Sequence, residues 1–218
     1  MVKPMITLQT SLNFSQTLYK VLEFHLPERA SIIDPTPGEK HSWKYYLTER
    51  KKPSLIPLKE FNIIFIEDDI LSFDKTIKYV EEEGKVDSIF FDPPYIFGKE
   101  GTGCDWGDVR REDYGEYYYS VEEVEAFFEE ADIKFPKLLK NNGMLFLKYT
   151  DVYSVKDRKF FFCAARWPNV LSNFKVVDHY IIPHHHISPT AWQVKNRPCG
   201  IVNYTYLTAF RKEDKIEN

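Results

Sequence analysis

The sequence predicts a single α/β domain, on the basis of its element pattern and its composition. Short runs of β-branched and aromatic residues alternate with segments of helical periodicity. The 218 residues are 43% hydrophobic and 28% charged, which suits one globular domain covering residues 1–218. No apolar run approaches the roughly 20 residues of a membrane-spanning helix, and the first residues lack the apolar core of a secretory signal. Three scattered cysteines favour a reducing compartment, so we expect a cytoplasmic protein with no membrane partner.

The first half of the chain contains three candidate buried strands. An amphipathic helix over residues 17–22 precedes the first strand, at residues 30–33. That strand must stop at the following Asp-Pro-Thr-Pro-Gly, because two prolines and a glycine cannot continue it. A helix is expected over residues 39–51. The second and third strands are predicted at residues 61–66 and 86–91.

A long glycine-containing stretch, about residues 96–119, is predicted to be a flexible substrate loop. Ser120 and Glu123 then have the spacing of a capping box, and residues 121–139 follow with helical periodicity. We expect that helix to end at residues 141–143, with Gly143 in the left-handed conformation.

The remaining elements are predicted from shorter patterns. A strand is expected at residues 144–148 and a helix at about residues 158–171. Late strands are expected at residues 175–182 and 201–210. The segment between them, about residues 183–200, mixes basic, amide and aromatic side chains, so we interpret it as a loop on the substrate side.

The net charge of −4 hides a strong asymmetry along the chain. Residues 1–130 hold 15 Lys and Arg against 26 Asp and Glu, a net of −11, whereas residues 131–212 hold 13 against 4, a net of +9. A basic face can therefore still meet a polyanion. A nucleic-acid partner fits this pattern if the basic residues gather around the functional edge of the sheet.

Acidic residues follow three of the predicted strands. Asp34 ends the first strand, Glu67, Asp68 and Asp69 follow the second, and Asp92 follows the third. Ligands of open parallel α/β sheets bind at the carboxyl ends of the strands, where carboxylates accept hydrogen bonds from ribose hydroxyls or amines. Each acid alone is equally well explained as a helix cap or turn former, but three in order favour a ligand site.

The sharpest motif is Asp92-Pro93-Pro94-Tyr95, directly after a very apolar strand. The two prolines fix the loop backbone, so that a carbonyl can be held toward a ligand beside the carboxylate. Such acceptors suit an NH2 group, and a following tyrosine suits stacking on a planar base.

With this motif the chain resembles the class I S-adenosylmethionine-dependent methyltransferases that methylate amino groups. Asp-Pro-Pro-Tyr is typical of their DNA adenine-N6 members, including phage and microbial enzymes, and of some RNA guanine-N2 members. Residues 34–43 resemble the cofactor loop of a microbial subgroup, although Lys40 stands where a second glycine is usual. Residues 61–69, 143–148 and 201–212 are similar to further strands of the family.

The resemblance implies a Rossmann-like fold with helices on both faces of a mostly parallel seven-stranded sheet, one strand being antiparallel. It implies S-adenosyl-L-methionine as the cofactor, DNA (alternatively RNA) as the partner, extrusion of the target base, and no catalytic metal. The acid that contacts the cofactor is Glu67, Asp68 or Asp69, and we favour Asp68. The implied catalytic residues are Asp92, Pro93, Pro94 and Tyr95; the implied cofactor residues are Asp34, Pro35, Thr36, Gly38, Asp68, Asp69 and Asp92.

The substrate-binding candidates are Tyr95 of the motif and two basic pairs, Arg110 with Arg111 and Lys195 with Arg197. The consecutive histidines 184–186 fit no common metal-site spacing, so we expect them in a solvated or substrate-contacting loop. Two alternatives to DNA adenine-N6 methylation stay open. One is RNA guanine-N2 methylation; the other, motivated by Lys40, is a nucleic-acid-binding module on a methyltransferase scaffold without activity.

Overall fold

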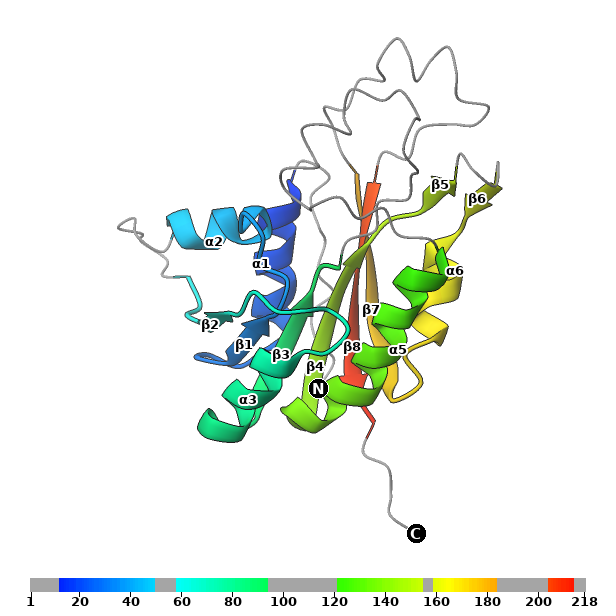
Figure 1. The fold of residues 1–218 in the computed structure, drawn as a ribbon. Helices are drawn as coiled ribbons and strands as arrows, with labels where there is room; N and C mark the ends of the chain where they lie inside the picture. The colour runs from blue at the N-terminus through cyan, green and yellow to red at the C-terminus, as the bar shows by residue number, and fades with distance from the viewer. Residues whose placement is uncertain (1–11, 50–57, 94–120, 155–158, 184–203, 214–218) are drawn as a thin grey trace.

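A mixed six-stranded sheet forms the centre of the computed structural model, which describes residues 12–49, 58–93, 121–154, 159–183 and 204–213 (Figure 1). The strand order is β2-β1-β3-β4-β8-β7. The strands are β1 (Ser31–Asp34), β2 (Asn62–Phe65), β3 (Val86–Phe91), β4 (Leu139–Tyr149), β7 (Phe174–Pro183) and β8 (Tyr204–Lys212). The expected loop at 96–119 and the Ser120 cap lie outside the described residues, as does the expected loop at 183–200 apart from Pro183, which ends β7.

The sheet is parallel from β2 to β4, and β8 is antiparallel to both of its neighbours. The expected mixture of parallel strands with one reversed strand is therefore confirmed, but a seventh strand is not. Residues 58–93 are all described, and they contain only one helix between β2 and β3. From β1 the chain proceeds to β2 on one side and later to β3 on the other. This reversal places a topological switch point between β1 and β3, where ligands of such sheets bind.

Helices cover both faces of the sheet (Figure 1). On one face lie α1 (Phe14–His25), the 3₁₀ turn η1 (His41–Trp43) and α2 (Lys44–Glu49). On the other lie α3 (Asp74–Glu83), α5 (Val121–Leu138), α6 (Cys163–Arg166) and η2 (Trp167–Asn169). Among the helices that the structure describes, none combines the length and apolar character needed to cross a bilayer.

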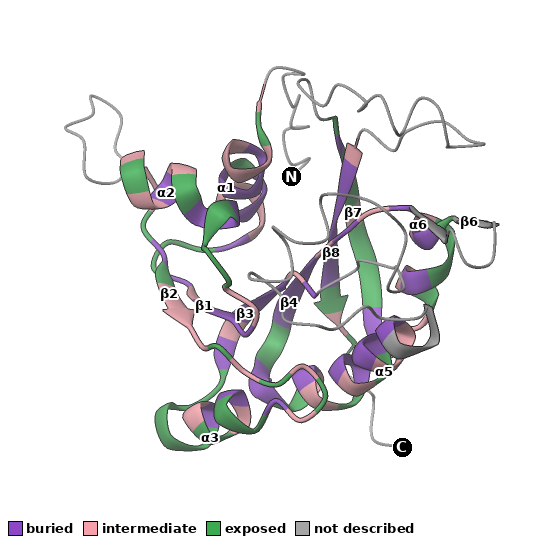
Figure 2. Cartoon of the chain, turned by 45° about the horizontal axis from the view of Figure 1, so that its top comes forward, coloured by how far each residue is buried: buried purple, intermediate pink, exposed green. Residues whose placement is uncertain are grey.

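Alternation along β4 divides the apolar residues between two cores. Met144 and Phe146 belong to the cluster under α1, whereas Leu145 and Leu147 belong to the cluster under α5. Successive strand residues point to opposite faces, so a strand covered on both sides must be apolar throughout. Figure 2 shows this as buried colouring along β4 and β8, while the edge strand β7 is largely exposed.

Two local predictions are corrected by the structure. The helix expected at 158–171 is instead a short strand, β6 (Lys159–Phe161), followed by α6 and η2. Strand β6 pairs with β5 (Val152–Ser154) in a separate antiparallel hairpin. Consecutive aromatic residues favour a strand at the start of this segment, and Pro168 belongs at the start of a helical turn rather than inside a long helix.

The helix before β4 also ends differently from the prediction. It stops at Leu138, and the left-handed residue is Asn142 (φ 58°) rather than Gly143. Asparagine is among the few residues that tolerate this conformation. Gly143 is required for space, because a Cβ there would lie 2.8 Å from both the Leu139 Cβ and the Lys140 carbonyl oxygen.

A buried carboxylate joins the end of β4 to the start of β8. Asp151 is 3% exposed and accepts hydrogen bonds from the Tyr204 and Tyr206 hydroxyls, both at 2.9 Å. Its second oxygen accepts the Ala164 amide of α6 at 3.2 Å. Desolvation raises the pKa of both tyrosines, and the nearby carboxylate raises it further. Three elements therefore depend on one acidic side chain.

Replacing Asp151 by alanine is expected to lower the free energy of unfolding by about 3 kcal/mol, because buried donors lose their acceptor. Tyr204→Phe, which removes one donor and leaves the carboxylate satisfied, is expected to cost about 1 kcal/mol. Urea denaturation of both variants measures the two values. Equal losses would show that Asp151 does not organise the junction.

Candidate active site

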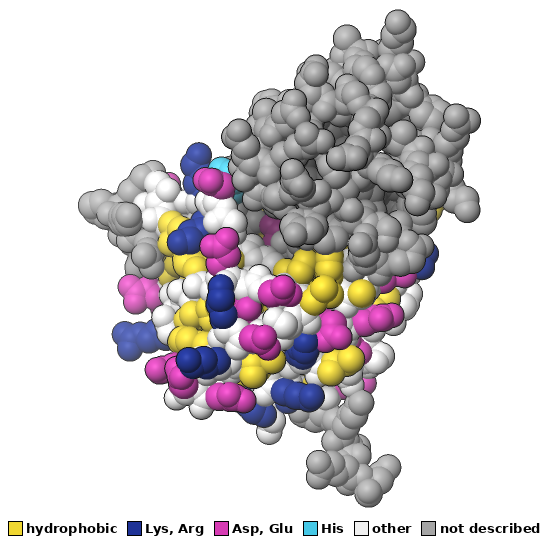
Figure 3. Space-filling model, viewed as in Figure 1, with side chains coloured by type: hydrophobic (Ala, Val, Ile, Leu, Met, Phe, Trp, Pro, Cys, Tyr) yellow, Lys and Arg dark blue, Asp and Glu magenta, His cyan; other side chains and the backbone are white. Residues whose placement is uncertain are grey.

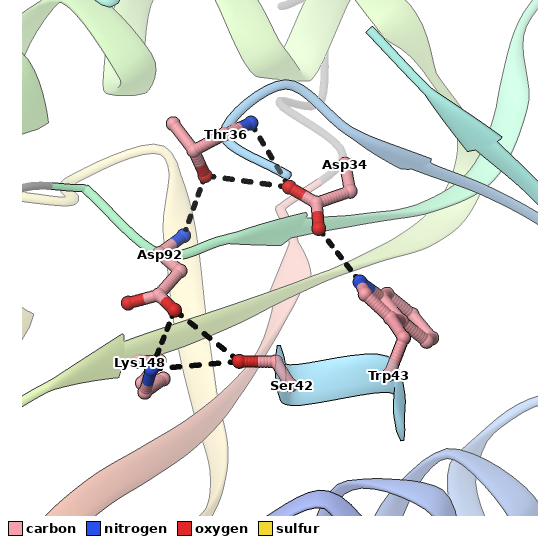
Figure 4. A network of polar contacts seen from close by, with 6 residues as sticks. All are labelled: Asp34, Thr36, Ser42, Trp43, Asp92 and Lys148. Atoms are coloured by element: carbon pink, nitrogen blue, oxygen red, sulfur yellow. Dashed lines mark hydrogen bonds and ion pairs between the residues drawn. The ribbon is translucent and has the colours of Figure 1, made fainter. Parts of the chain in front are cut away.

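The ends of β1 and β3 meet at the switch point, and the loop after β1 connects them. Asp34 is the last residue of β1, and Asp92 directly follows β3. Thr36 of the loop contacts both Asp34 and Asp92, and Ser42 of the 3₁₀ turn contacts Asp92 (Figure 4). Two of the predicted strand-end acids are therefore brought into one polar network.

The buried Asp34 carboxylate binds two residues of the loop after β1. It is 1% exposed and accepts the Trp43 indole N–H at 2.6 Å, the Thr36 amide at 2.9 Å and the Thr36 hydroxyl at 3.3 Å. Desolvation raises the pKa of Asp34 to about 7, although these donors oppose the rise. Since both oxygens already have donors, Asp34 fixes the loop shape; direct cofactor contact by Asp34 stays a prediction.

Asp92 is held by its backbone and by one carboxylate oxygen. Its amide donates to the Thr36 hydroxyl at 3.0 Å. Its Oδ2 accepts from the Lys148 ammonium at 2.5 Å and from the Ser42 hydroxyl at 3.3 Å. No hydrogen bond to Oδ1 comes from any residue that the structure describes, and Figure 4 draws no contact to this oxygen. Asp92 is thus a positioned carboxylate, one oxygen of which has no donor among the described residues.

Sequence reasoning missed Lys148. In the parallel register of β3 and β4, Phe91 pairs with Leu147, so Asp92 and Lys148 occupy equivalent positions one residue further along. Neighbouring residues at equivalent positions extend to the same face of a sheet. The sequence does show a lysine directly after the apolar run of β4. Its position beside Asp92, however, can be predicted only when the pairing of β3 with β4 is known.

The acids after β2 have separate roles. Asp68 accepts the Thr76 amide and hydroxyl, both at 2.7 Å, and so caps α3, whose N-cap residue Phe73 supplies no side-chain hydrogen bond. Asp69 accepts the amides of Leu71 and Ser72 in a turn. The cap and turn interpretation fits both residues better than the cofactor role predicted for them.

Glu67 differs from these two acids. Its side chain is exposed, and no hydrogen bond to its carboxylate comes from the described residues. It follows β2 by two positions, beside the loop after β1, since the Asp68 amide donates to the Pro35 carbonyl oxygen at 3.3 Å. Of the three acids left open by the sequence, Glu67 therefore has the available carboxylate.

The loop contains two left-handed residues, Gly38 (φ 42°) and Lys40 (φ 58°). A Cβ at Gly38 would meet nothing within 4 Å, so the space beside it is open. The Lys40 ammonium lies 4.5 Å from the centre of the Phe65 ring at the end of β2. Glycine adopts this left-handed conformation more readily than lysine does.

The other predicted site residues are only partly described. Pro93 is buried next to Asp92. Pro94, the stacking candidate Tyr95 and the histidines 184–186 lie outside the described residues, as do the substrate-binding candidates Arg110, Arg111, Lys195 and Arg197.

The described basic residues of the +9 segment do not gather around Asp92. Three of them lie at the opposite ends of the strands from Asp92, where β4 begins and β8 ends: Lys140, Arg211 and Lys212. Arg166 pairs with Glu125, whereas Lys148, also among the described basic residues, pairs with Asp92 in the candidate site. In Figure 3 basic and acidic side chains are interspersed over the described part of the visible face. The described residues therefore do not form the basic surface that was expected around the candidate site.

Comparison with known proteins gives structural similarity only. No family model and no curated protein sequence matches. Solved structures that match include TrmN from Thermus thermophilus (11% identity, TM-score 0.45, covering 91% of this chain and 48% of TrmN). Another is the N-methyltransferase NodS from Bradyrhizobium japonicum in complex with S-adenosyl-L-homocysteine (13% identity, TM-score 0.40, covering 85% of this chain and 67% of NodS). A third is a putative DNA modification methylase, also from Thermus thermophilus (17% identity, TM-score 0.37, covering 66% of this chain and 53% of the methylase). The chain spans about half the length of TrmN.

The raised pKa of Asp34 predicts a pH-dependent contribution to stability. The unfolded chain releases this proton near pH 3.8 and the folded protein near pH 7, so the contribution is complete below pH 4 and declines as the pH rises to 7. The free energy of unfolding of wild type relative to Asp34→Asn is expected to fall by at most about 4 kcal/mol over this interval. Denaturation at pH 4, 5.5 and 7 measures it. A constant difference would show that Asp34 ionises normally.

The left-handed conformation of Lys40 predicts different effects for two small substitutions. Both variants lose the contact with Phe65, but Lys40→Gly relieves the backbone, whereas Lys40→Ala keeps the unfavourable conformation. We expect the glycine variant to be about 1 kcal/mol more stable than the alanine variant. Thermal unfolding compares them, and an alanine variant of equal or higher stability would contradict the assignment.

Proposed function

We propose that this protein is an S-adenosyl-L-methionine-dependent methyltransferase that acts on an exocyclic amino group of a nucleobase, adenine N6 in DNA. The observation that carries the proposal is the Asp92 carboxylate. It stands at the switch point of the sheet, is fixed through Thr36, Ser42 and Lys148, and keeps Oδ1 available for an NH2 donor. Its motif, Asp-Pro-Pro-Tyr, is the one on which the resemblance to amino-methyltransferases rests.

The residues beside Asp92 fit the cofactor. Open space lies next to Gly38, where an added side chain would intrude on a ligand. The exposed Glu67 carboxylate suits a pair of ribose hydroxyls, and it takes the role first predicted for Asp68. The bound cofactor supplies an electrophilic methyl group on a sulfonium, and Glu67 and the loop of residues 35–40 would hold it.

Asp92 acts on the amine. The exocyclic nitrogen is a poor nucleophile because its lone pair is delocalised into the ring. An N–H donated to Asp92 Oδ1, and a second donated to the Pro93 carbonyl, favour tetrahedral nitrogen and localise the lone pair. The cofactor would supply its methyl group to this nitrogen, and the electrons of the broken carbon–sulfur bond would return to sulfur. The methylated nitrogen would then release one proton to the Asp92 carboxylate, with which it is hydrogen-bonded.

Two alternative functions have to be distinguished from this one. An RNA methyltransferase would use the same NH2 donor, at guanine N2, and a non-catalytic nucleic-acid-binding module would transfer no methyl group. Transfer of labelled methyl from S-adenosyl-L-methionine to duplex DNA, single-stranded DNA, total RNA and protein, followed by nucleoside analysis, separates these possibilities. The proposal predicts label in N6-methyladenine from DNA. Label in N2-methylguanine from RNA would replace the target, and no label in any pool would overturn the proposal.

Asp92→Ala is expected to lower kcat by at least about 100-fold, because the amine loses its charged acceptor. The substitution leaves the Thr36 contact of the Asp92 backbone intact, so the loop should keep its shape. Methyl transfer to the substrate found above measures the effect. Calorimetric affinity for S-adenosyl-L-methionine serves as the control and is expected to change less than threefold.

Wild-type activity in a folded Asp92→Ala variant would contradict this role. A parallel loss of cofactor affinity would indicate instead that Asp92 stabilises the loop.

A further inference from the structure

The ion pair between Asp92 and Lys148 lies inside the candidate site. The two charged atoms are 2.5 Å apart, and the side chains are 19% and 18% exposed. The pair therefore loses much of the water that screens surface ion pairs, and its attraction is correspondingly stronger. The carboxylate that is to receive the substrate amine already has a full positive charge beside it.

The Lys148 ammonium is fixed by three different elements. It contacts Asp92 after β3, the Ser42 hydroxyl of η1 at 3.4 Å, and the face of the Phe14 ring at the start of α1 at 4.8 Å. Attraction of an ammonium by an aromatic face adds to the ion pair when both are partly desolvated. Such a lysine stays in place instead of moving aside for a second cation.

The charge balance at this position decides what kind of amine can approach. Within the described network of Figure 4, the charges of Asp92 and Lys148 cancel, and Asp34 adds only part of a negative charge, because burial raises its pKa to about 7. An alkyl ammonium would thus meet a positive neighbour without net attraction. The NH2 group of a nucleobase is uncharged at neutral pH and needs only the oxygen lone pair at Asp92 Oδ1.

We propose that Lys148 is a positioning residue that fixes the Asp92 carboxylate and, by neutralising it, restricts the acceptor to uncharged amines. This inference rests on the proposed function. It adds a source of selectivity against cationic amines that does not depend on the shape of the pocket.

A second lysine of β4 provides a matched control. Lys140 pairs with Asp87 of β3 at 2.9 Å, so the same two strands carry the same pair of side chains at the opposite edge of the sheet. Lys140→Met removes an equivalent charge from the same strand without touching the candidate site. Lys148→Met and Lys148→Arg complete the set, the arginine keeping the charge.

The first measurement is steady-state methyl transfer with the full chain. Lys148→Met is expected to lower kcat at least tenfold while the KM for S-adenosyl-L-methionine changes less than threefold. Lys148→Arg is expected to recover part of kcat, and Lys140→Met to match wild type. A purely structural lysine would change both constants or neither, and unchanged kcat in Lys148→Met would overturn the positioning role.

The second measurement does not require activity. Titration with ethylammonium chloride, followed through the backbone amide signals of Asp92 and Thr36, is expected to show at least tenfold tighter binding to Lys148→Met than to wild type or Lys140→Met. Equal affinity for all three would overturn the selectivity. If wild type methylates no nucleobase but this difference is observed, the proposed function fails while the charge effect of Lys148 stands.

Discussion

The buried carboxylate of Asp34 is the interaction on which the rest of the site depends. A carboxylate removed from water needs donors, and Asp34 obtains them from Thr36 and Trp43 of its own loop. These contacts determine where η1 lies and thereby bring Ser42 to Asp92. The Trp43 ring packs edge-on against Phe65 of β2 and Phe90 of β3, so the loop is anchored on both sides of β1. The end of β3 is thus positioned through the end of β1.

Acids in similar strand-end positions have different roles because their hydrogen-bond donors differ. The loop surrounds Asp34 completely, whereas Asp68 is turned toward the first amides of α3. Glu67 is exposed to solvent. Asp92 shares one oxygen with Lys148 and Ser42, and its other oxygen accepts no hydrogen bond from the described residues. Strand topology brings carboxylates to the ligand edge, and local donors then decide which of them a ligand can reach.

The sequence predicted the features that depend on neighbours along the chain. Strand β3 was predicted with its observed bounds, because Val86–Phe91 is rich in apolar and aromatic residues and is stopped by Asp-Pro-Pro. The loop after β1 was also predicted, because its two prolines and its glycine cannot continue a strand. Lys148 was not found, because its role depends on the register between β3 and β4. The capping role of Asp68 was missed for a similar reason, since only the folded chain brings its carboxylate to the amide and hydroxyl of Thr76.

We propose that Gly38, Glu67 and Asp92 together form a site for S-adenosyl-L-methionine and an amine. Calorimetric titration of the wild type and of Glu67→Gln with S-adenosyl-L-homocysteine measures this binding. We expect saturable binding at one site per chain in the wild type, weakened at least tenfold in Glu67→Gln, because charged hydrogen bonds to the ribose are lost. No binding to the wild type, or equal affinity for both proteins, would contradict it.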